Sequence, residues 1–261
     1  MSSYQHQIRC HRDEIDMDFW RKPEGVSIAD DDLSFLLIPD EVEAIATFEL
    51  SQQVHRYQEN QVGAGQPITK ALIVTMGGML PGVLLYDHLV DGRSEGVPKI
   101  EFGTIGVSLY KGPGVRYENP LVQHGISIPI SGETVLIIDD LGDCGGTMQF
   151  LTQYISDSGA LKVLNLAMYM KPVAMKTCAA DFWFGETPQD TWIITPRERV
   201  ETMVKRVPIW KERGASEEEC YRRLVEVIGY PRQLTDYYLP DIYRREQPAA
   251  DLNSLESLVK S

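Results

Sequence analysis

The chain has 261 residues, 43% of them hydrophobic and 24% charged, so its length allows one large or two small domains with an ample core. Its formal net charge of -13, without a local basic patch, argues against binding to nucleic acid or to an anionic membrane surface. The sequence has no apolar run long enough for a transmembrane helix and no secretory signal at its start, and its four cysteines are scattered without a C-x-x-C pair. We therefore expect a cytoplasmic protein without a membrane segment, a disulfide scaffold or a structural zinc site.

The first elements along the chain are an arm and a helix. Residues 1–37 mix charges and contain Asp30-Asp31-Asp32, which predicts a solvated or covering N-terminal arm. A helix is predicted from Pro39 onward, because acidic residues occupy its positive end and apolar residues then recur at helical spacing. The apolar positions are Val42, Ile45, Ala46, Leu50, Val54 and Tyr57.

A strand, a glycine turn and a helix follow in residues 71–89. Ala71 to Thr75 form an apolar run that predicts a buried strand, and Met76 to Gly82 form the turn before the helix. Backbone N–H groups of Gly77 and Gly78 could bind an anion there, although tight turns need glycine in any case.

A strand and a long loop are predicted next. Ile100 to Tyr110 alternates in the manner of a strand. Lys111 to Pro129 carries three prolines and three glycines, which predicts a loop, and loops of this length are usually functional or disordered. Lys111 and Arg116 are either solvated charges or charges used in a site.

The central motif of the sequence is the stretch from Val135 to Thr147. Four apolar residues, Val135 to Ile138, predict a strand buried on both faces, as in a parallel sheet. Two carboxylates, Asp139 and Asp140, follow at its carboxyl end, and a turn rich in glycine then leads into a helix. In doubly wound sheets this edge is where ligands bind.

The turn has the chemistry of a sugar-phosphate site. Its glycines let the backbone approach a ligand, and the N-terminus of the next helix presents N–H groups that suit a phosphate. Thr147 adds a hydroxyl donor. Asp139 and Asp140 would repel a phosphate, so they suit ribose hydroxyls or a divalent cation.

The rest of the chain adds strands and a helical extension. Gln149 to Ser156 predicts a helix that ends at Gly159, and Val163 to Met170 predicts a strand followed by Lys171. Ser216 and Glu219 form a capping box before a helix that stops at Gly229. We expect residues 201–261 to form a C-terminal helical extension.

The central motif resembles that of the type I phosphoribosyltransferases, in which two acidic residues and two spacers precede Asp-Thr/Ser-Gly-x-Thr. Asp139, Asp140, Asp143, Gly145 and Thr147 match this pattern, whereas Cys144 departs from the usual Thr or Ser. The resemblance covers about residues 38–200. It implies an α/β fold, a doubly wound and mainly parallel sheet with a small hood, to which the C-terminal helices are appended.

Two further stretches resemble the purine members of this family. The turn after Thr75 resembles their pyrophosphate loop, with Met76 at the usual basic position before Gly77 and Gly78. In the family a mobile loop closes over the transition state, and Lys111 and Arg116 would supply charge from that place. The Lys-Pro and Pro-Gln-Asp-Thr-Trp-Ile stretches resemble xanthine-guanine phosphoribosyltransferases, which implies base-binding roles for Lys171, Trp192 and Ile193.

The implied reaction transfers a phosphoribosyl group from 5-phosphoribosyl 1-pyrophosphate to guanine, xanthine or hypoxanthine, giving a nucleoside monophosphate and pyrophosphate. Asp139 and Asp140 would hold the ribose hydroxyls and Mg²⁺, and Asp143 would act as general base toward purine N7. The 5′-phosphate would bind to Gly142, Cys144, Gly145, Gly146 and Thr147. The family also implies a homo-oligomer with small-molecule substrates.

Two alternatives remain open from the sequence. Met76, Cys144 and the C-terminal extension are compatible with a weak or inactive member that binds a nucleotide as a regulator. Arg197, where the family usually continues Pro-Trp, is compatible with a transferase for a different base.

Overall fold

The computed structural model describes residues 15–63, 65–112 and 115–245, with the backbone alone for residues 109–112 and 115–119. The described chain folds into two compact units, each assembled from separate segments. The first contains residues up to 23, residues 40–108 and residues 120–189. The second contains residues 24–39, 109–119 and those from 190 onward.

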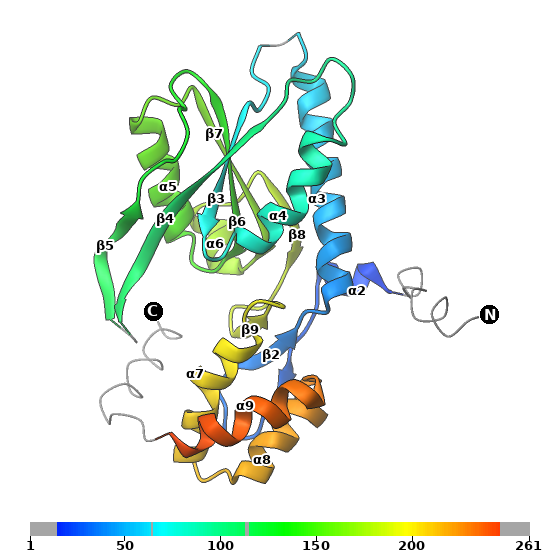
Figure 1. Cartoon of the computed structure of the whole chain (residues 1–261), viewed down its shortest axis with the longest axis vertical. Coiled ribbons are helices and arrows are strands. Elements are labelled where there is room, and N and C mark those ends of the chain that lie inside the picture. The colour runs from blue at the N-terminus through cyan, green and yellow to red at the C-terminus, as the bar shows by residue number, and fades with distance from the viewer. Residues whose placement is uncertain (1–14, 64, 113–114, 246–261) are drawn as a thin grey trace, which may run out of the picture. The chain divides into compact units, whose positions relative to one another are not determined.

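A six-stranded sheet forms the framework of the first unit, in the order β5-β4-β3-β6-β7-β8 (Figure 1). Its strands are β3 (Lys70–Thr75), β4 (Glu101–Gly112), β5 (Val115–His124), β6 (Thr134–Gly142), β7 (Lys162–Met170) and β8 (Phe182–Glu186). The β4/β3, β3/β6, β6/β7 and β7/β8 pairs are all parallel. The expected mainly parallel α/β fold is confirmed.

Helices pack on both sides of this sheet. They are α3 (Asp40–Gln61), α4 (Met79–Val90), α5 (Gly146–Asp157) and the short α6 (Pro172–Thr177). On one face Leu151 and Ile155 of α5 pack in a cluster with Val135 and Ile137 of β6. Helices α3 and α4 contact each other, and α4 also contacts β3 and β6.

The central strand β6 has the burial that the sequence predicted. Each side chain from Val135 to Ile138 is buried, and each such aliphatic chain stabilises the fold by about 1.5–3 kcal/mol. Because both faces are covered, no polar residue interrupts the strand until Asp139, where the site begins.

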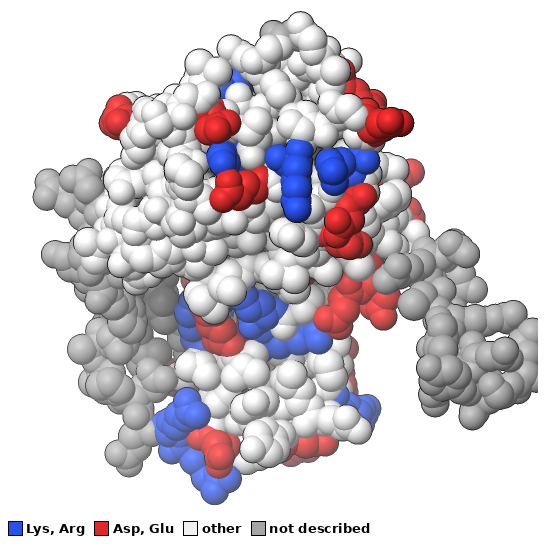
Figure 2. Space-filling model, turned by 45° about the horizontal axis from the view of Figure 1, so that its top comes forward, with Lys and Arg blue, Asp and Glu red and all other residues white. Residues whose placement is uncertain are grey.

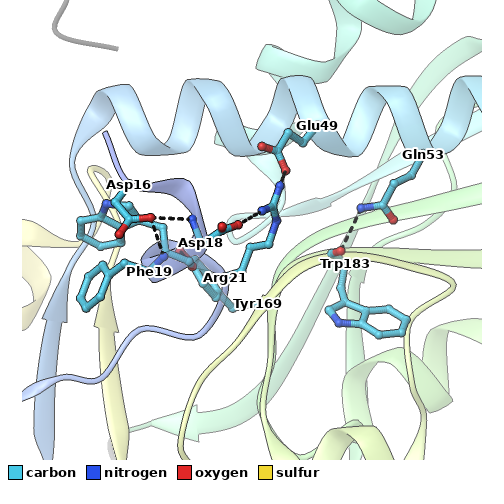
Figure 3. Close-up of polar contacts among 9 residues, drawn as sticks. Asp16, Asp18, Phe19, Arg21, Glu49, Gln53, Tyr169 and Trp183 are labelled. Atoms are coloured by element: carbon cyan, nitrogen blue, oxygen red, sulfur yellow. Dashed lines mark hydrogen bonds and ion pairs between the residues drawn. The ribbon is translucent and has the colours of Figure 1, made fainter. Parts of the chain in front are cut away.

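A short N-terminal helix, α2 (Met17–Arg21), covers part of the first unit (Figure 3). Asp16 caps it, and Arg21 forms an ion pair of 2.7 Å with Glu49 of α3. Tyr169 of β7 donates a hydrogen bond of 3.1 Å to the Trp20 carbonyl. The described end of the expected arm is therefore a covering segment.

The second unit has a three-stranded sheet and a helical layer. The sheet order is β1-β2-β9, with β1 (Val26–Ser27) antiparallel to β2 (Ser34–Leu37) and β2 parallel to β9 (Thr191–Ile194). Its helices are α7 (Arg199–Glu212), α8 (Glu217–Arg222), the π-helix η2 (Arg223–Ile228) and α9 (Arg232–Arg244). Ser216 accepts a hydrogen bond from the Glu219 N–H as the expected cap, and Gly229 ends the helix with φ +93°.

A buried ion pair lies in the core of the second unit. Both carboxylate oxygens of Asp31 lie 2.6 Å from the Arg206 guanidinium, and the Trp210 indole donates to the same carboxylate at 2.6 Å. The Asp31 and Arg206 side chains are 0% and 8% exposed. Charged groups as buried as these need each other, because neither has water to solvate it.

The observed units do not coincide with the three segments 1–37, 38–200 and 201–261 expected from the sequence. Residues 24–39 lie in the same unit as the C-terminal helices, because β2 pairs with β9. A boundary placed by composition cannot detect a pairing between strands so far apart in the chain.

The predicted loop at Lys111–Pro129 was wrong in most of its length. Strands β4 and β5 occupy residues up to 112 and 115–124, so the non-strand part of the described segment begins at Gly125. Pro120 lies within β5, which is the edge strand, and an edge position tolerates proline because one side of the strand needs no ladder hydrogen bond. Within the described ranges, each helix is too short or too polar to span a lipid bilayer.

Candidate active site

The turn after β6 is shaped by two glycines. Gly145 has φ +81° at the N-cap of α5, a left-handed conformation that favours glycine. A Cβ at Gly145 would lie 3.1 Å from Thr177 Cβ and 3.2 Å from the Cys178 backbone N, so this turn also packs tightly against the end of α6. At Gly142 a Cβ would lie 2.7 Å from Met170 Cε. The bare backbone at Gly142 and Gly145 thus lets this turn pack against Met170 and against the end of α6.

The structure brings the two predicted glycine turns together at the carboxyl ends of β3 and β6. A Cβ at Gly77 would lie 2.6 Å from Oδ1 of both Asp139 and Asp140, and one at Gly78 would overlap the Ile138 carbonyl oxygen. Asp139 Oδ1 also accepts a hydrogen bond of 3.0 Å from the Asp140 N–H. The backbone of the first glycine turn therefore lies against the two carboxylates that follow β6, about sixty residues later in the sequence.

The turn after β3 carries Thr75 and Met76. Their peptide bond is cis, and the Met76 side chain is 60% exposed. Thr75 Oγ1 lies 3.3 Å from Nε2 of His124, a residue to which the sequence reasoning assigned no role. The Thr75 hydroxyl and the His124 imidazole thus lie together next to Gly77 and Gly78.

Asp143 and Lys171 form an ion pair next to the phosphate-type turn. Lys171 Nζ lies 2.9 Å from Asp143 Oδ1, and the side chains are 9% and 47% exposed. The Lys171 backbone N–H also donates to the Gly142 carbonyl at 2.8 Å. Lys171 therefore connects β7 to both the start of the turn and its acidic residue.

Gln189 is a second connection to this turn that sequence reasoning missed. Its Oε1 accepts a hydrogen bond of 3.1 Å from the Val173 N–H, and its Nε2 donates to the Asp143 carbonyl at 3.4 Å. Gln189 lies within the Pro-Gln-Asp-Thr-Trp-Ile stretch, whose resemblance pointed only to the Trp and the Ile. His124 and Gly106 had no comparable signal, because their meeting depends on strand register.

Trp192 and Ile193 lie on β9 in the second unit, where they point to opposite faces of the strand. The Trp192 ring is partly buried beside the core cluster, and its Nε1 donates to Thr202 Oγ1 of α7 at 3.0 Å. Lys205 Nζ and the Arg206 guanidinium lie 5.5 and 5.9 Å from the centre of the indole ring. Ile193 is 7% exposed, so little of its side chain is accessible from solvent.

The side chains of Lys111 and Arg116 lie outside the described residues, so their expected role stays a prediction. In the described part of the chain, no group of three or more His, Cys, Asp or Glu side chains has a metal-binding arrangement. The pair Asp139 and Asp140 is nevertheless compatible with Mg²⁺, which is usually held by one or two carboxylates together with substrate phosphates and water.

Burial controls the ionisation of two groups near the turn. It raises the pKa of the Cys178 thiol, with a further contribution from Asp181, so the thiol stays protonated. Burial also raises the pKa of Tyr169, followed by the effect of Glu43, which keeps the phenol available as the donor to Trp20.

Charges of both signs are mixed on the surface. Figure 2 shows Lys and Arg side chains lying next to Asp and Glu side chains on the visible face, with large uncharged areas between them. Ion pairs such as Arg197 with Glu198 at 2.8 Å follow the same pattern.

Xanthine-guanine phosphoribosyltransferases are among the sequence relatives of this chain, although no protein-family model matches it. The xanthine-guanine phosphoribosyltransferase of Idiomarina loihiensis is 28% identical over 149 residues, 57% of this chain and 81% of that protein. The enzyme of the same name from Nitratidesulfovibrio vulgaris is 26% identical over 132 residues, 50% of this chain and 69% of that protein. A solved purine phosphoribosyltransferase from Pyrococcus horikoshii superimposes on 62% of this chain and 92% of its own, with 23% identity and a TM-score of 0.49. The two sequence relatives confirm the predicted resemblance.

Proposed function

We propose that this chain, which is similar to purine phosphoribosyltransferases, transfers a phosphoribosyl group from 5-phosphoribosyl 1-pyrophosphate to a 6-oxopurine. The observation that carries the proposal is the Asp143–Lys171 ion pair of 2.9 Å beside the glycine turn. It supplies an acceptor and a donor side by side, which is what N7–H and O6 of an oxopurine require.

Asp143 and Lys171 would recognise the base together. Lys171 has three N–H donors and no acceptor, so it can keep Asp143 and still donate to O6. The 6-amino group of adenine offers no acceptor at that place. Asp143 would accept the proton from N7 as the base becomes the nucleophile. The roles of Trp192 and Ile193 as flanks of the ring rest on the resemblance.

The turn from Gly142 to Thr147 would bind the 5′-phosphate through backbone N–H groups and the Thr147 hydroxyl. Asp139 and Asp140 would accept hydrogen bonds from the ribose hydroxyls and stabilise positive charge that develops on the ring as the anomeric bond breaks. Mg²⁺, which we propose these carboxylates hold together with the donor, would neutralise the departing pyrophosphate. Thr75, Gly77 and Gly78 would line the pyrophosphate side, with Met76 exposed at its rim.

A regulator that binds a nucleotide without transfer is the second candidate. The observation in its favour is Met76, which places an uncharged and exposed side chain where the purine enzymes commonly have a basic residue. A transferase for a different base is the third, on the evidence of Arg197, which pairs with Glu198 and Glu201 instead of offering an aromatic surface.

Pyrophosphate release tests these candidates. The protein would be mixed with Mg²⁺, 5-phosphoribosyl 1-pyrophosphate and guanine, xanthine, hypoxanthine or adenine in turn. We expect release with an oxopurine, and a loss of about a hundredfold or more in Asp143→Asn, which keeps the shape but not the proton acceptor. Asp157→Asn is the matched control, because Asp157 lies at the far end of α5 and bonds only locally to Gln153.

The candidates give different results. Release with a base outside the oxopurines would favour the altered-specificity enzyme. No release with any base, together with retained binding of guanosine monophosphate, would refute the transferase and leave the regulator.

A further inference from the structure

His124 of β5 reaches across β4 to the end of β3, where the turn Met76-Gly77-Gly78 begins. It is the last residue of β5, and its ring lies over Gly106 of β4, which is the register partner of Thr75 on β3. Nε2 of the ring lies 3.3 Å from Thr75 Oγ1. The imidazole therefore ends one residue before the turn Met76-Gly77-Gly78.

Gly106 makes this reach possible. A Cβ at Gly106 would lie 2.8 Å from Nε2 of His124 and closer still to Cδ2. An alanine there would force the ring away from Thr75, because real Cβ atoms do not approach other atoms so closely. Because Gly106 of β4 has no side chain, the His124 ring from β5 can lie beside Thr75.

The hydrogen bonds of the ring define its donors. Nδ1 lies 3.1 Å from the Gly125 carbonyl oxygen, which can only accept, so Nδ1 carries a proton. In the neutral ring Nε2 then accepts from the Thr75 hydroxyl. An imidazolium ring donates from both of its nitrogens, so Nε2 can face an anion while Nδ1 keeps the Gly125 carbonyl oxygen.

We propose that His124 binds the pyrophosphate group of the donor, with Nε2 as a charge-assisted donor beside the Thr75 hydroxyl and the Gly77–Gly78 backbone. The assignment rests on the proposed function and deepens it. It gives the pyrophosphate side an imidazole at a turn whose own exposed side chain, Met76, is uncharged. It also explains why residue 106 is a glycine, because the atoms nearest to a Cβ at this position all belong to the His124 ring.

The test is a cycle of three variants, His124→Ala, Gly106→Ala and the double variant. Pyrophosphate affinity is measured by calorimetry with Mg²⁺ present, and KM for the donor and for the base are measured in parallel. Each single variant is expected to weaken pyrophosphate binding and raise the donor KM about tenfold, as for one lost charge-assisted hydrogen bond, with the base KM unchanged. The double variant is expected to be no worse than His124→Ala, because both changes remove the same contact.

Two further variants separate a contact from a general disturbance. Gly103→Ala lies on the same strand, and its Cβ would approach Ser127 Oγ at 2.7 Å instead of His124, so it should leave pyrophosphate affinity unchanged. His124→Gln keeps a donor near the Nε2 position without the charge, and partial recovery relative to His124→Ala is expected. His124 is exposed, so its variants should keep the wild-type melting temperature.

The outcomes distinguish this inference from the function on which it rests. Wild-type-like pyrophosphate affinity in both His124→Ala and Gly106→Ala would overturn the assignment while transfer continues. Pyrophosphate binding without transfer to any base would refute the transferase, and the calorimetric cycle would still decide on His124. A wild-type protein that binds no pyrophosphate would reject both.

Discussion

The strand–turn–helix of the candidate site in the first unit and the framework of the second unit differ in how far apart in the sequence their interacting residues lie. In the first unit, the turn that carries Asp143 and Gly145 directly follows β6, so strand, turn and helix form one continuous stretch. In the second unit, Ser34 pairs with Thr191, 157 residues later, and Asp31 pairs with Arg206, 175 residues later. The comparison teaches that the candidate site was readable because it is local, whereas the framework of the second unit was hidden because it is not.

The largest expected effect on stability comes from the buried pair of the second unit. Asp31→Ala leaves Arg206 charged and buried without its partner and removes the acceptor of Trp210, so we expect a loss of about 3–5 kcal/mol in the free energy of unfolding. Denaturant unfolding measures it. Asp32→Ala is the matched control, since that side chain is 71% exposed and lies 3.9 Å from Arg213, and it should cost under about 1 kcal/mol. Equal losses in the two variants would contradict the structural role of the buried pair.

The glycine turn of the first unit should respond less in stability and more in function. Gly145→Ala forces a side chain into the left-handed conformation and against Thr177 and Cys178, which should cost about 1–3 kcal/mol and raise the donor KM. Gly132→Ala has a similar backbone, φ +76°, with no atom within 4 Å of the new Cβ. It should therefore show the backbone strain without the change in KM. A normal donor KM in Gly145→Ala would separate this turn from phosphate binding.

A hydroxyl of α7 provides a test of the role that the resemblance assigns to Trp192. Thr202→Val removes the acceptor of the Trp192 indole at a fully buried position and should cost about 1 kcal/mol of stability. Under the proposed role of Trp192, the base KM should rise about threefold while the donor KM stays the same. Thr202→Ser retains the hydroxyl and should restore both quantities. A shift of tryptophan emission without a change in base KM would limit Trp192 to packing.

The smallest effect is expected at the helix surface of the second unit. Arg222 and Arg223 hydrogen-bond Glu219 and lower the pKa of its carboxyl group to about 2. Because the folded pKa is lower than the ordinary 4.5, this group stabilises the fold above that pH and loses its contribution as the pH falls toward about 2. Glu219 and Arg222 are 32% and 51% exposed, whereas Arg223 is 7% exposed, so Glu219→Gln should cost less than about 1 kcal/mol at pH 7.

Thermal unfolding at pH 7 and at pH 3 measures that contribution. The difference between wild type and Glu219→Gln should shrink at the lower pH. Glu217→Gln leaves both arginine pairs intact and is the control for the loss of one charge in the same helical turn. A difference that grows on acidification would contradict the sign of the pKa shift.

Much of the first unit could be predicted because its signals are local. The run from Val135 to Ile138 indicated a doubly covered strand, and the positive φ of Gly145 agrees with the glycine-rich turn that was expected there. The prolines and glycines after Lys111 predict a loop, and this prediction is wrong because an edge strand accommodates Pro120. His124 went unassigned because its neighbours Thr75 and Gly106 are defined by strand register, which no stretch of sequence reveals.

The sequence by itself determined the class of the fold, the strand–turn–helix of the candidate site and the residues from Asp139 to Thr147, because each depends on neighbours along the chain. Only the tertiary structure decided that Gly77 lies against Asp139 and Asp140, that Lys171 pairs with Asp143, and that Asp31 pairs with Arg206. These contacts join residues from different elements. They follow from which strands are adjacent and in what register, and that is settled by the packing of the whole unit and not by any local pattern.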